Sequence, residues 1–261
     1  MPKALPLETT AVKSSSTSTK RAKRAKPAPK KAAAVAFEGF ADSKARFFHE
    51  LAENQDRDWF AAHKAEFEEG WNKPMAQLLH EVGAKVDAAF PDCDLGAPKV
   101  FRIYRDVRFG KDKSPYKTHT GGLIMARSRR AESVTEVPIA LYIQVGTETF
   151  AAAGQYMMTP DSLSKFRAAV VDPKRGAELV KLLAKLVEKG FEPGAYAMMA
   201  NVPRGFEAGH PRADLLKHKG LIVRFPPVPA ALLNKPDLSA WIAEHVKHAA
   251  PLVRWLVFAT A

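Results

Sequence analysis

The stretch IALYIQVGTETFAAAGQY, residues 139–156, decides the fold class that the sequence predicts. It contains two apolar runs of strand length, residues 139–145 and 149–156, with a glycine in the short segment that joins them. Runs rich in β-branched and aromatic residues on either side of a glycine-marked turn are typical of neighbouring β-strands. The sequence therefore predicts a group of adjacent strands in the middle of the chain.

Further strand-like segments lie on both sides of this stretch. One of them contains the pair Gly121-Gly122, which favours a bulge or a close backbone approach over a phosphate-binding loop. The additional strands are predicted over residues 99–109, 118–126, 195–201 and 221–225.

Helical patterns flank the predicted strands. The closing helix, from about residue 238, carries an apolar stripe, and Pro251 is expected to kink or split it. Because the strands cluster in the middle and strict βαβ alternation is absent, the predicted class is α+β, with a largely antiparallel central sheet and helices packed on it. The other helices are predicted to begin at Asp42 or Ser43, Asp56, Pro74 and Thr159, and one ends at Gly190.

The positive charge of the chain is concentrated near its start. The formal net charge is +12 over 261 residues. Residues 1–36 hold nine basic side chains and one acid, a net charge of +8, which leaves +4 for residues 37–261. Segments rich in Ser, Thr, Lys, Ala and Pro bury too little apolar surface to fold, so residues 1–36 are predicted to be a disordered tail and residues 37–261 a single domain. The tail is interpreted either as an electrostatic arm for non-specific nucleic acid or as a solubilising segment.

Several classes of protein do not fit the sequence. It has neither an apolar run of about 18 residues nor an apolar signal core near its start, so we expect no membrane partner and a cytoplasmic location. Cys93 is the only cysteine and lies between two aspartates, which argues against a disulfide and against a reactive thiolate. His245 and His248 lack a third ligand at a recognised spacing, and nucleotide-binding motifs are absent. No metal and no cofactor are therefore predicted.

The most unusual segment is FRIYRDVRFGKDKSPYKTH, residues 101–119. If the strand continues to residue 109, the apolar side chains share one face with Arg105, and the other arginines share the opposite face with Asp106. An arginine on an apolar face is costly unless it is paired, and its planar fork matches phosphate and carboxylate oxygens. Two interpretations stay open: a site for an anionic ligand, or an ion network in which Asp106 and Asp112 pair with arginines and fix a loop.

The anion-site hypothesis assigns roles to individual residues. Proton transfer is assigned to His119, Tyr116 and Asp106, and His119 is favoured because the pKa of a histidine normally lies near neutrality. Whether the protein is an enzyme stays open. The predicted ligand-binding residues are Arg102, Arg105, Arg108, Lys111, Lys113 and Lys117.

The same segment resembles the hallmark motif of a bacterial family catalogued as domain-of-unknown-function family 2461. The resemblance rests on FRIYRDVRF followed by KDKSPYKT, and it extends over roughly residues 40–258. This chain has Gly110 where the family usually has serine, which argues against a catalytic role for that position. The resemblance implies kinship and carries no activity with it. Further matching positions are Asn54, Trp59, Phe60, His63, Lys64, Gly154, Gln155, Tyr156, Pro160, Leu163, Arg167, Pro203, Arg204, Gly205, Phe206, His210, Pro211, Leu215, Leu216 and Lys217.

Three functions are consistent with the sequence. The first is a protein that binds a phosphorylated or other anionic small ligand through residues 101–119. It would be an enzyme if the proton-transfer assignment holds. The second is a structural or protein-interaction module in which the charged segment only fixes a loop. The third is a nucleic-acid-associated protein that binds through residues 1–36.

Overall fold

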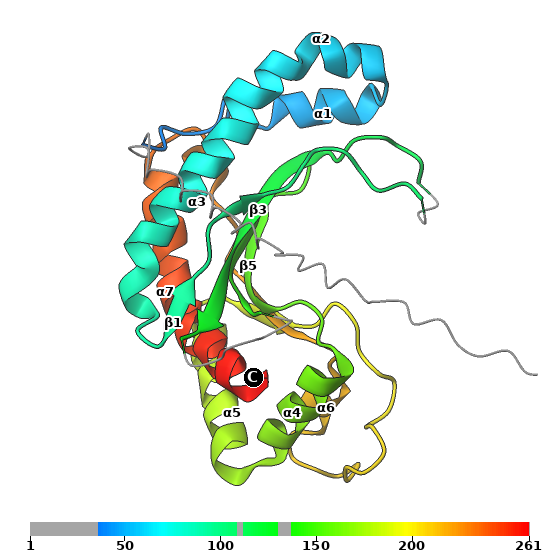
Figure 1. Ribbon diagram of the computed structural model, residues 1–261, viewed down its shortest axis with the longest axis vertical. Helices are drawn as coiled ribbons and strands as arrows, with labels where there is room; N and C mark the ends of the chain where they lie inside the picture. The colour runs from blue at the N-terminus through cyan, green and yellow to red at the C-terminus, as the bar shows by residue number, and fades with distance from the viewer. Residues whose placement is uncertain (1–35, 109–111, 130–136, 261) are drawn as a thin grey trace, which may run out of the picture. The chain divides into compact units, whose positions relative to one another are not determined.

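The computed structural model describes residues 36–108, 112–129 and 137–260, which belong to one compact unit. Residues 1–35 of the predicted tail lie outside the described residues, as does Lys111. The described chain has the predicted α+β class: an antiparallel sheet, helices on both ends of the sequence and a long C-terminal helix (Figure 1).

The described strands form a seven-stranded sheet in which the paired strands are antiparallel. The order is β1-β3-β4-β5-β7-β6, and β2 also pairs with β3. The centre of the sheet confirms three of the predicted strands, because β3, β4 and β5 follow one another as neighbours. The strands are β1 Cys93–Leu95, β2 Lys99–Val100, β3 His119–Ser128, β4 Ile139–Gly146, β5 Phe150–Gln155, β6 Glu192–Gly194 and β7 Leu221–Arg224.

The helices begin where the sequence offers a cap. Asp56 accepts a hydrogen bond from the Trp59 backbone N–H, and Thr159 accepts one from that of Ser162, as predicted. The first helix begins at Arg46, three to four residues later than its predicted cap. The α-helices are α1 Arg46–Glu53, α2 Arg57–Phe67, α3 Lys73–Val86, α4 Pro160–Val171, α5 Pro173–Glu188, α6 Ala213–Lys217 and α7 Asp237–Thr260.

A π-helical turn, η1 Glu68–Asn72, joins α2 and α3. Trp71 in this turn is fully buried and packs edge-on against Phe48 of α1, with ring centroids 5.0 Å apart. The carbonyl oxygen of Gly70 accepts a hydrogen bond from Ala41 at 3.0 Å. The π turn thus joins the two helices and also holds the segment that leads into α1.

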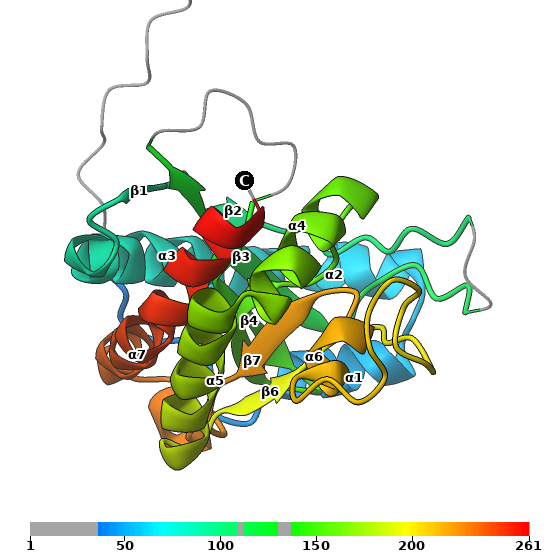
Figure 2. The ribbon, with the colours of Figure 1, turned by 90° about the horizontal axis from the view of Figure 1, so that it is seen from below.

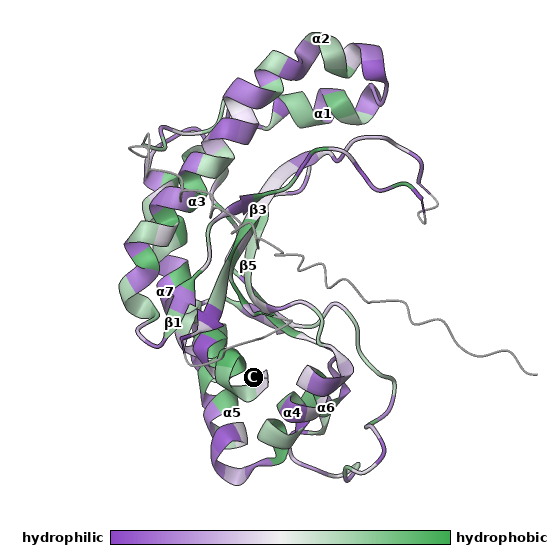
Figure 3. Cartoon of the chain, in the orientation of Figure 1, coloured by the Kyte–Doolittle hydropathy of each residue, from purple (hydrophilic) through white to green (hydrophobic). Residues whose placement is uncertain are grey.

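The two faces of the sheet have different neighbours. Figures 1 and 2 show α3 and α7 on one side of the strands. A Cβ atom added to Gly122 of β3 would lie 2.5 Å from the Leu79 side chain of α3, so this side of β3 is in close contact with the helix. It would also lie 2.7 Å from the Lys99 carbonyl oxygen, which confirms the close backbone approach that the glycine pair predicted. In Figure 3, β5 is drawn in the green of hydrophobic residues. We call the side opposite α3 and α7 the open face.

Three sequence predictions differ from the structure. The strand predicted over residues 99–109 ends at Val100, and the segment predicted as a strand at 195–201 forms only an isolated bridge between Met198 and His218. Pro251 does not split α7, which is a single helix from Asp237 to Thr260, and the alternative that it kinks the helix stays a prediction. The buried residues around Pro251 hold the helix together, so tertiary packing overrides the missing backbone donor.

Candidate anion-binding cleft

Beyond β2, residues 101–108 and 112–118 form an arm that extends away from the sheet beside α2 (Figure 1). Its two sides are joined by hydrogen bonds from Arg105 N–H to the Pro115 carbonyl and from Lys117 N–H to the Ile103 carbonyl, both 2.8 Å. The predicted alternation of faces persists, because exposed residues alternate with buried or half-buried ones over residues 101–108. The ladder is incomplete since Pro115 has no N–H to donate.

Carboxylates pair with two of the three arginines of the arm. Arg105 forms an ion pair with Asp112, and Arg108 binds Asp106 through two hydrogen bonds of 2.7 and 3.0 Å. The Arg108 side chain holds the pKa of Asp106 below its usual value. The pKa of Asp112 is also lowered, first by hydrogen bonds from Ser114 and then by Arg105. These are the pairs that the ion-network interpretation predicts.

The lysines of the arm bind backbone carbonyls. Lys113 donates to the Val107 carbonyl at 2.8 Å, and Lys117 donates to the Arg102 carbonyl at 3.0 Å. Burial, together with the charges of Arg102 and Arg105, lowers the pKa of Lys117. The described lysines thus connect the two sides of the arm.

An aromatic cluster attaches the arm to α2. The Tyr116 ring stacks on Phe60 with centroids 4.4 Å apart, and Tyr104 lies 6.1 Å from Phe60 and 5.5 Å from Tyr116. The Tyr116 N–H also donates to Gln55 Oε1 at 3.1 Å. Tyr116 is buried, whereas Tyr104 is 48% exposed, so Tyr104 offers its surface to an open space beside the helix.

This space is an open cleft of about 570 Å³ between α2 and the arm. Its cations are Arg57 and Lys64 of α2 and Arg105 of the arm. No acidic side chain is among the described residues that line it. The other lining residues are Phe60, Ala61, Tyr104, Val107, Pro115 and Tyr116.

Sequence reasoning did not assign Arg57 and Lys64 to the site. They stand seven residues apart in α2, with Phe60 and Ala61 between them at helical spacing. Positions i, i+3, i+4 and i+7 share one face of a helix, so this stripe was the available signal. Of the predicted ligand-binding residues that the structure describes, only Arg105 lines the cleft.

The three proton-transfer candidates are not brought together in the cleft, since only Tyr116 lines it. Burial and the nearby Tyr104 raise the pKa of Tyr116, so its hydroxyl is protonated at neutral pH. Burial, Lys117 and Arg105 lower the pKa of His119, which lies at the start of β3. Asp106 is engaged with Arg108. Their catalytic role stays a prediction.

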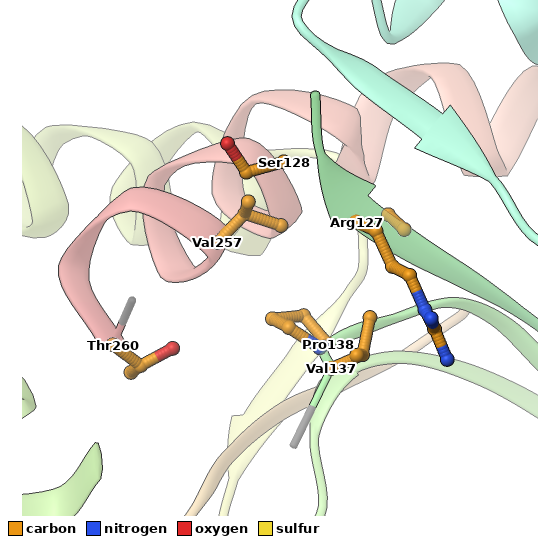
Figure 4. Close-up of a pocket in the computed structure, with 7 residues that line it drawn as sticks. Arg127, Ser128, Val137, Pro138, Val257 and Thr260 are labelled. Carbon is orange, nitrogen blue, oxygen red and sulfur yellow. The ribbon is translucent and has the colours of Figure 1, made fainter. Parts of the chain in front are cut away.

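Two other hollows are less suited to a ligand. Figure 4 shows one between the end of β3 and α7, lined by residues that include Arg127, Pro138 and Val257. Its volume is about 10 Å³, roughly that of one water molecule. A second, on the surface of α1, is lined by two basic and two acidic side chains, so its formal charges balance: Lys44, Arg46, Glu50 and Glu53.

Comparison with known protein families agrees with the resemblance of residues 101–119 to the family motif. A family model described as "Conserved hypothetical protein (DUF2461)" matches residues 43–255. The chain belongs to the DUF2461 family. The DUF2461 match spans α2, the arm and the sheet, and therefore both walls of the cleft. No curated protein and no solved structure matches the chain.

The described part of the DUF2461 chain offers neither a metal-ligand cluster nor a membrane-spanning helix. Its described residues contain no group of three or more His, Cys, Asp or Glu side chains placed to hold a metal ion. Within residues 36–108, 112–129 and 137–260, no helix combines the length and the hydropathy of a membrane span. Cys93 is buried, and burial is the first cause of its raised thiol pKa.

Proposed function

We propose that the cleft between α2 and the arm binds a small ligand that carries a phosphate or another anionic group. The observation that supports this most directly is the convergence of Arg57, Lys64 and Arg105 from two separate elements on a cleft without acidic lining. Guanidinium groups match the oxygens of phosphate and carboxylate, and lysine adds a point charge. Three cations at one opening favour a ligand with at least one negative charge.

The apolar lining of the cleft indicates which chemical class of ligand fits it. Tyr104, which is 48% exposed, and the half-buried Val107 present apolar surface beside the three cations. A bare inorganic anion would leave this surface in contact with water, whereas a ligand with an apolar or planar part next to its anionic group would cover it. Nucleotides and aryl phosphates have this combination, so we place them ahead of simple sugar phosphates.

Asp112 competes with the ligand for Arg105. In the absence of a ligand, the carboxylate of Asp112 neutralises the Arg105 guanidinium. Asp112 also accepts hydrogen bonds from the backbone and hydroxyl of Ser114, at 2.9 and 2.6 Å, so it has partners of its own when Arg105 turns to a ligand. The ion network and the anion site are therefore compatible in one arm.

Binding of nucleotides and aryl phosphates to single-site variants tests the proposal. Arg57→Gln, Lys64→Gln and Arg105→Gln should each weaken binding by about tenfold or more, since a hydrogen bond to a charged group contributes about 1.5–3 kcal/mol. Titration calorimetry gives the dissociation constants. Lys181→Gln, at an exposed lysine of α5, is the matched control and should bind as the parent does.

Asp112→Asn tests the same proposal with a substitution that should strengthen binding of the anionic ligand. It removes the competing charge and keeps an oxygen acceptor for Ser114, so binding of the anion should become tighter. Weaker or unchanged binding in this variant, together with full binding in the three cation variants, would contradict the proposal.

Two expectations from the sequence belong to this proposal as well. We propose a cytoplasmic location, which cell fractionation tests. We also propose that the basic residues 1–36 add non-specific affinity for nucleic acid. Deleting them should then lower the affinity and its salt dependence, and unchanged binding without them would contradict this part.

A further inference from the structure

The open face of the sheet carries a group of aromatic rings outside the cleft. In β4 and β5, Tyr142 and Phe150 have ring centroids 5.6 Å apart. Strand alternation puts both on the side opposite α3 and α7, because their neighbours Leu141, Ile143 and Ala151 are the residues buried on the covered side. Tyr156 directly follows β5, and its neighbour Gln155 points to the covered side, where it accepts a hydrogen bond from Thr260 of α7 at 3.3 Å. Tyr156 therefore lies on the open side.

The ring group extends to both edges of the sheet. The Phe101 ring, at the base of the arm, lies 6.3 Å from that of Tyr142. At the other end, Tyr196, which follows β6, lies 4.4 Å from Tyr156. Burial, a hydrogen bond with Tyr196 and the nearby Tyr142 raise the pKa of Tyr156 to about 12. The open face thus carries two ring groups, Phe101 with Tyr142 and Phe150, and Tyr156 with Tyr196.

Part of this surface is accessible to a partner. Tyr156 is 45% exposed and Tyr196 65%, and the neighbouring Met157 and Met198 are about half exposed. The rings of Phe101, Tyr142 and Phe150 are half-buried. Large apolar groups gathered on one exposed patch are typical of a recognition surface.

Basic side chains lie over the rings. The Arg224 guanidinium is 4.2 Å from the centre of the Phe150 ring, and the ammonium groups of Lys99 and Lys117 are 5.7 and 5.5 Å from that of Phe101. Arg224 is also paired with Glu148 at 2.9 Å. The two lysines lie at the base of the arm, so the aromatic surface borders a basic one.

We propose that the open face binds single-stranded nucleic acid, with bases stacked on the exposed tyrosines and phosphates near Lys99 and Lys117. Exposed rings bordered by cations match a chain of planar bases joined by anionic phosphates. A duplex hides the faces of its bases and would lose the stacking contacts. A basic peptide, such as the Lys-rich residues 20–31 of this chain, would be repelled by the same cations.

This site is distinct from the proposed cleft. The rings of the cleft, Phe60, Tyr104 and Tyr116, contact α2, whereas those of the open face contact one another across the strands. Variants at the two places therefore separate the two proposals.

Fluorescence anisotropy with the full-length chain and a labelled oligothymidylate or oligouridylate of about ten nucleotides tests the inference. Tyr156→Ala and Tyr196→Ala should each weaken binding by about fivefold or more, because one stacked base contributes at least that factor. Tyr156→Phe and Tyr196→Phe keep a ring and should retain most of the affinity. Every variant retains residues 1–36, so any contribution from the tail is common to all of them.

Matched controls define what would overturn the inference. Phe258→Ala removes a ring of similar exposure, 43%, from α7 and should leave binding unchanged. Lys99→Gln should make the slope of log affinity against log salt less steep by about 0.7, the value for one phosphate of a single strand. Equal affinity for a duplex of the same length, or unchanged binding in both Tyr→Ala variants, would overturn it. Absence of oligonucleotide binding at low salt, or binding of a proline-rich peptide in its place, would do the same.

Discussion

The two faces of the central sheet are built from the same strands but differ in chemistry. On the covered face, β4 contributes Leu141, Ile143 and Val145, all fully buried under the helices. On the open face, the alternate residues are Tyr142 and Gln144, and the tyrosine hydroxyl donates to the glutamine side chain at 2.8 Å. Because successive side chains point to opposite faces, alternate residues of one strand contribute to the buried core and to the proposed binding surface. Substitutions on the two faces should therefore have different consequences.

The largest expected difference is between Leu141→Ala and Tyr156→Ala. Leu141 is fully buried, so its truncation should lower the free energy of unfolding by about 3 kcal/mol through lost burial and a cavity. Tyr156 is 45% exposed, and its truncation should cost less than about 1 kcal/mol. Denaturant unfolding measures both. A loss of stability in Tyr156→Ala as large as that in Leu141→Ala would show that the open face belongs to the core.

Two adjacent glycines of β3 allow the covered and open faces to be compared by adding a single methyl group to each. A Cβ on Gly122 would lie 2.5 Å from Leu79 of α3 and 2.7 Å from the Lys99 carbonyl, so Gly122→Ala should cost about 1–3 kcal/mol. A Cβ on Gly121 points to the open face and meets the Ile143 carbonyl at 3.1 Å, which a small shift relieves. Gly121→Ala should therefore change stability by less than about 1 kcal/mol. Unfolding curves in which the two variants coincide would refute this asymmetry.

The smallest predicted effect concerns the helices that cover the sheet. Glu81 of α3 binds Lys85, Ser239 of α7 and the Phe37 N–H at 2.6, 2.6 and 3.0 Å. Partial burial raises the pKa of Glu81, but these hydrogen bonds outweigh it and lower the pKa to about 2. A lowered carboxyl pKa stabilises the fold above the unfolded value of 4.5, and this stability is lost as the pH falls toward 2.

Glu81→Gln tests that sign. The site is partly exposed, so the variant should lose about 1 kcal/mol of stability at neutral pH and show a flatter decline between pH 4.5 and 2 than the parent. Denaturant unfolding across this pH range measures the difference. Parallel pH profiles for the two proteins would contradict the assignment.

Much of the fold was predictable because local patterns determine it. Asp56 and Thr159 are caps whose effect extends over three residues, and the apolar runs of β4 and β5 indicate strands without distant partners. The strand prediction for residues 99–109 was wrong beyond Val100 because alternation persists in an arm that lacks a full ladder. Alternation reports which side chains are buried and does not report how the backbone is paired.

The candidate sites were harder to predict because distant segments form them. Arg57 and Arg105 are 48 residues apart, and the packing of Phe60 on Tyr104 and Tyr116 brings their elements together. Tyr196 reaches Tyr156 from a segment whose strand prediction was wrong. The acidic partners of the arm were predictable because Asp106 and Asp112 lie within a few residues of the arginines that they bind.

The π turn between α2 and α3 sets the rotation of α2 about the helix axis relative to α3. One residue more or less in a helix rotates everything beyond it by about 100°. Because η1 lies between the cleft wall on α2 and the helix that covers the sheet, its residue count sets the direction in which Arg57 and Lys64 point relative to the core. An insertion or deletion at residues 68–72 would therefore change the direction of the Arg57 and Lys64 side chains, whereas a substitution there would leave the residue count and this rotation unchanged. Across a set of relatives, helix length at this turn would then vary together with the cationic residues of α2.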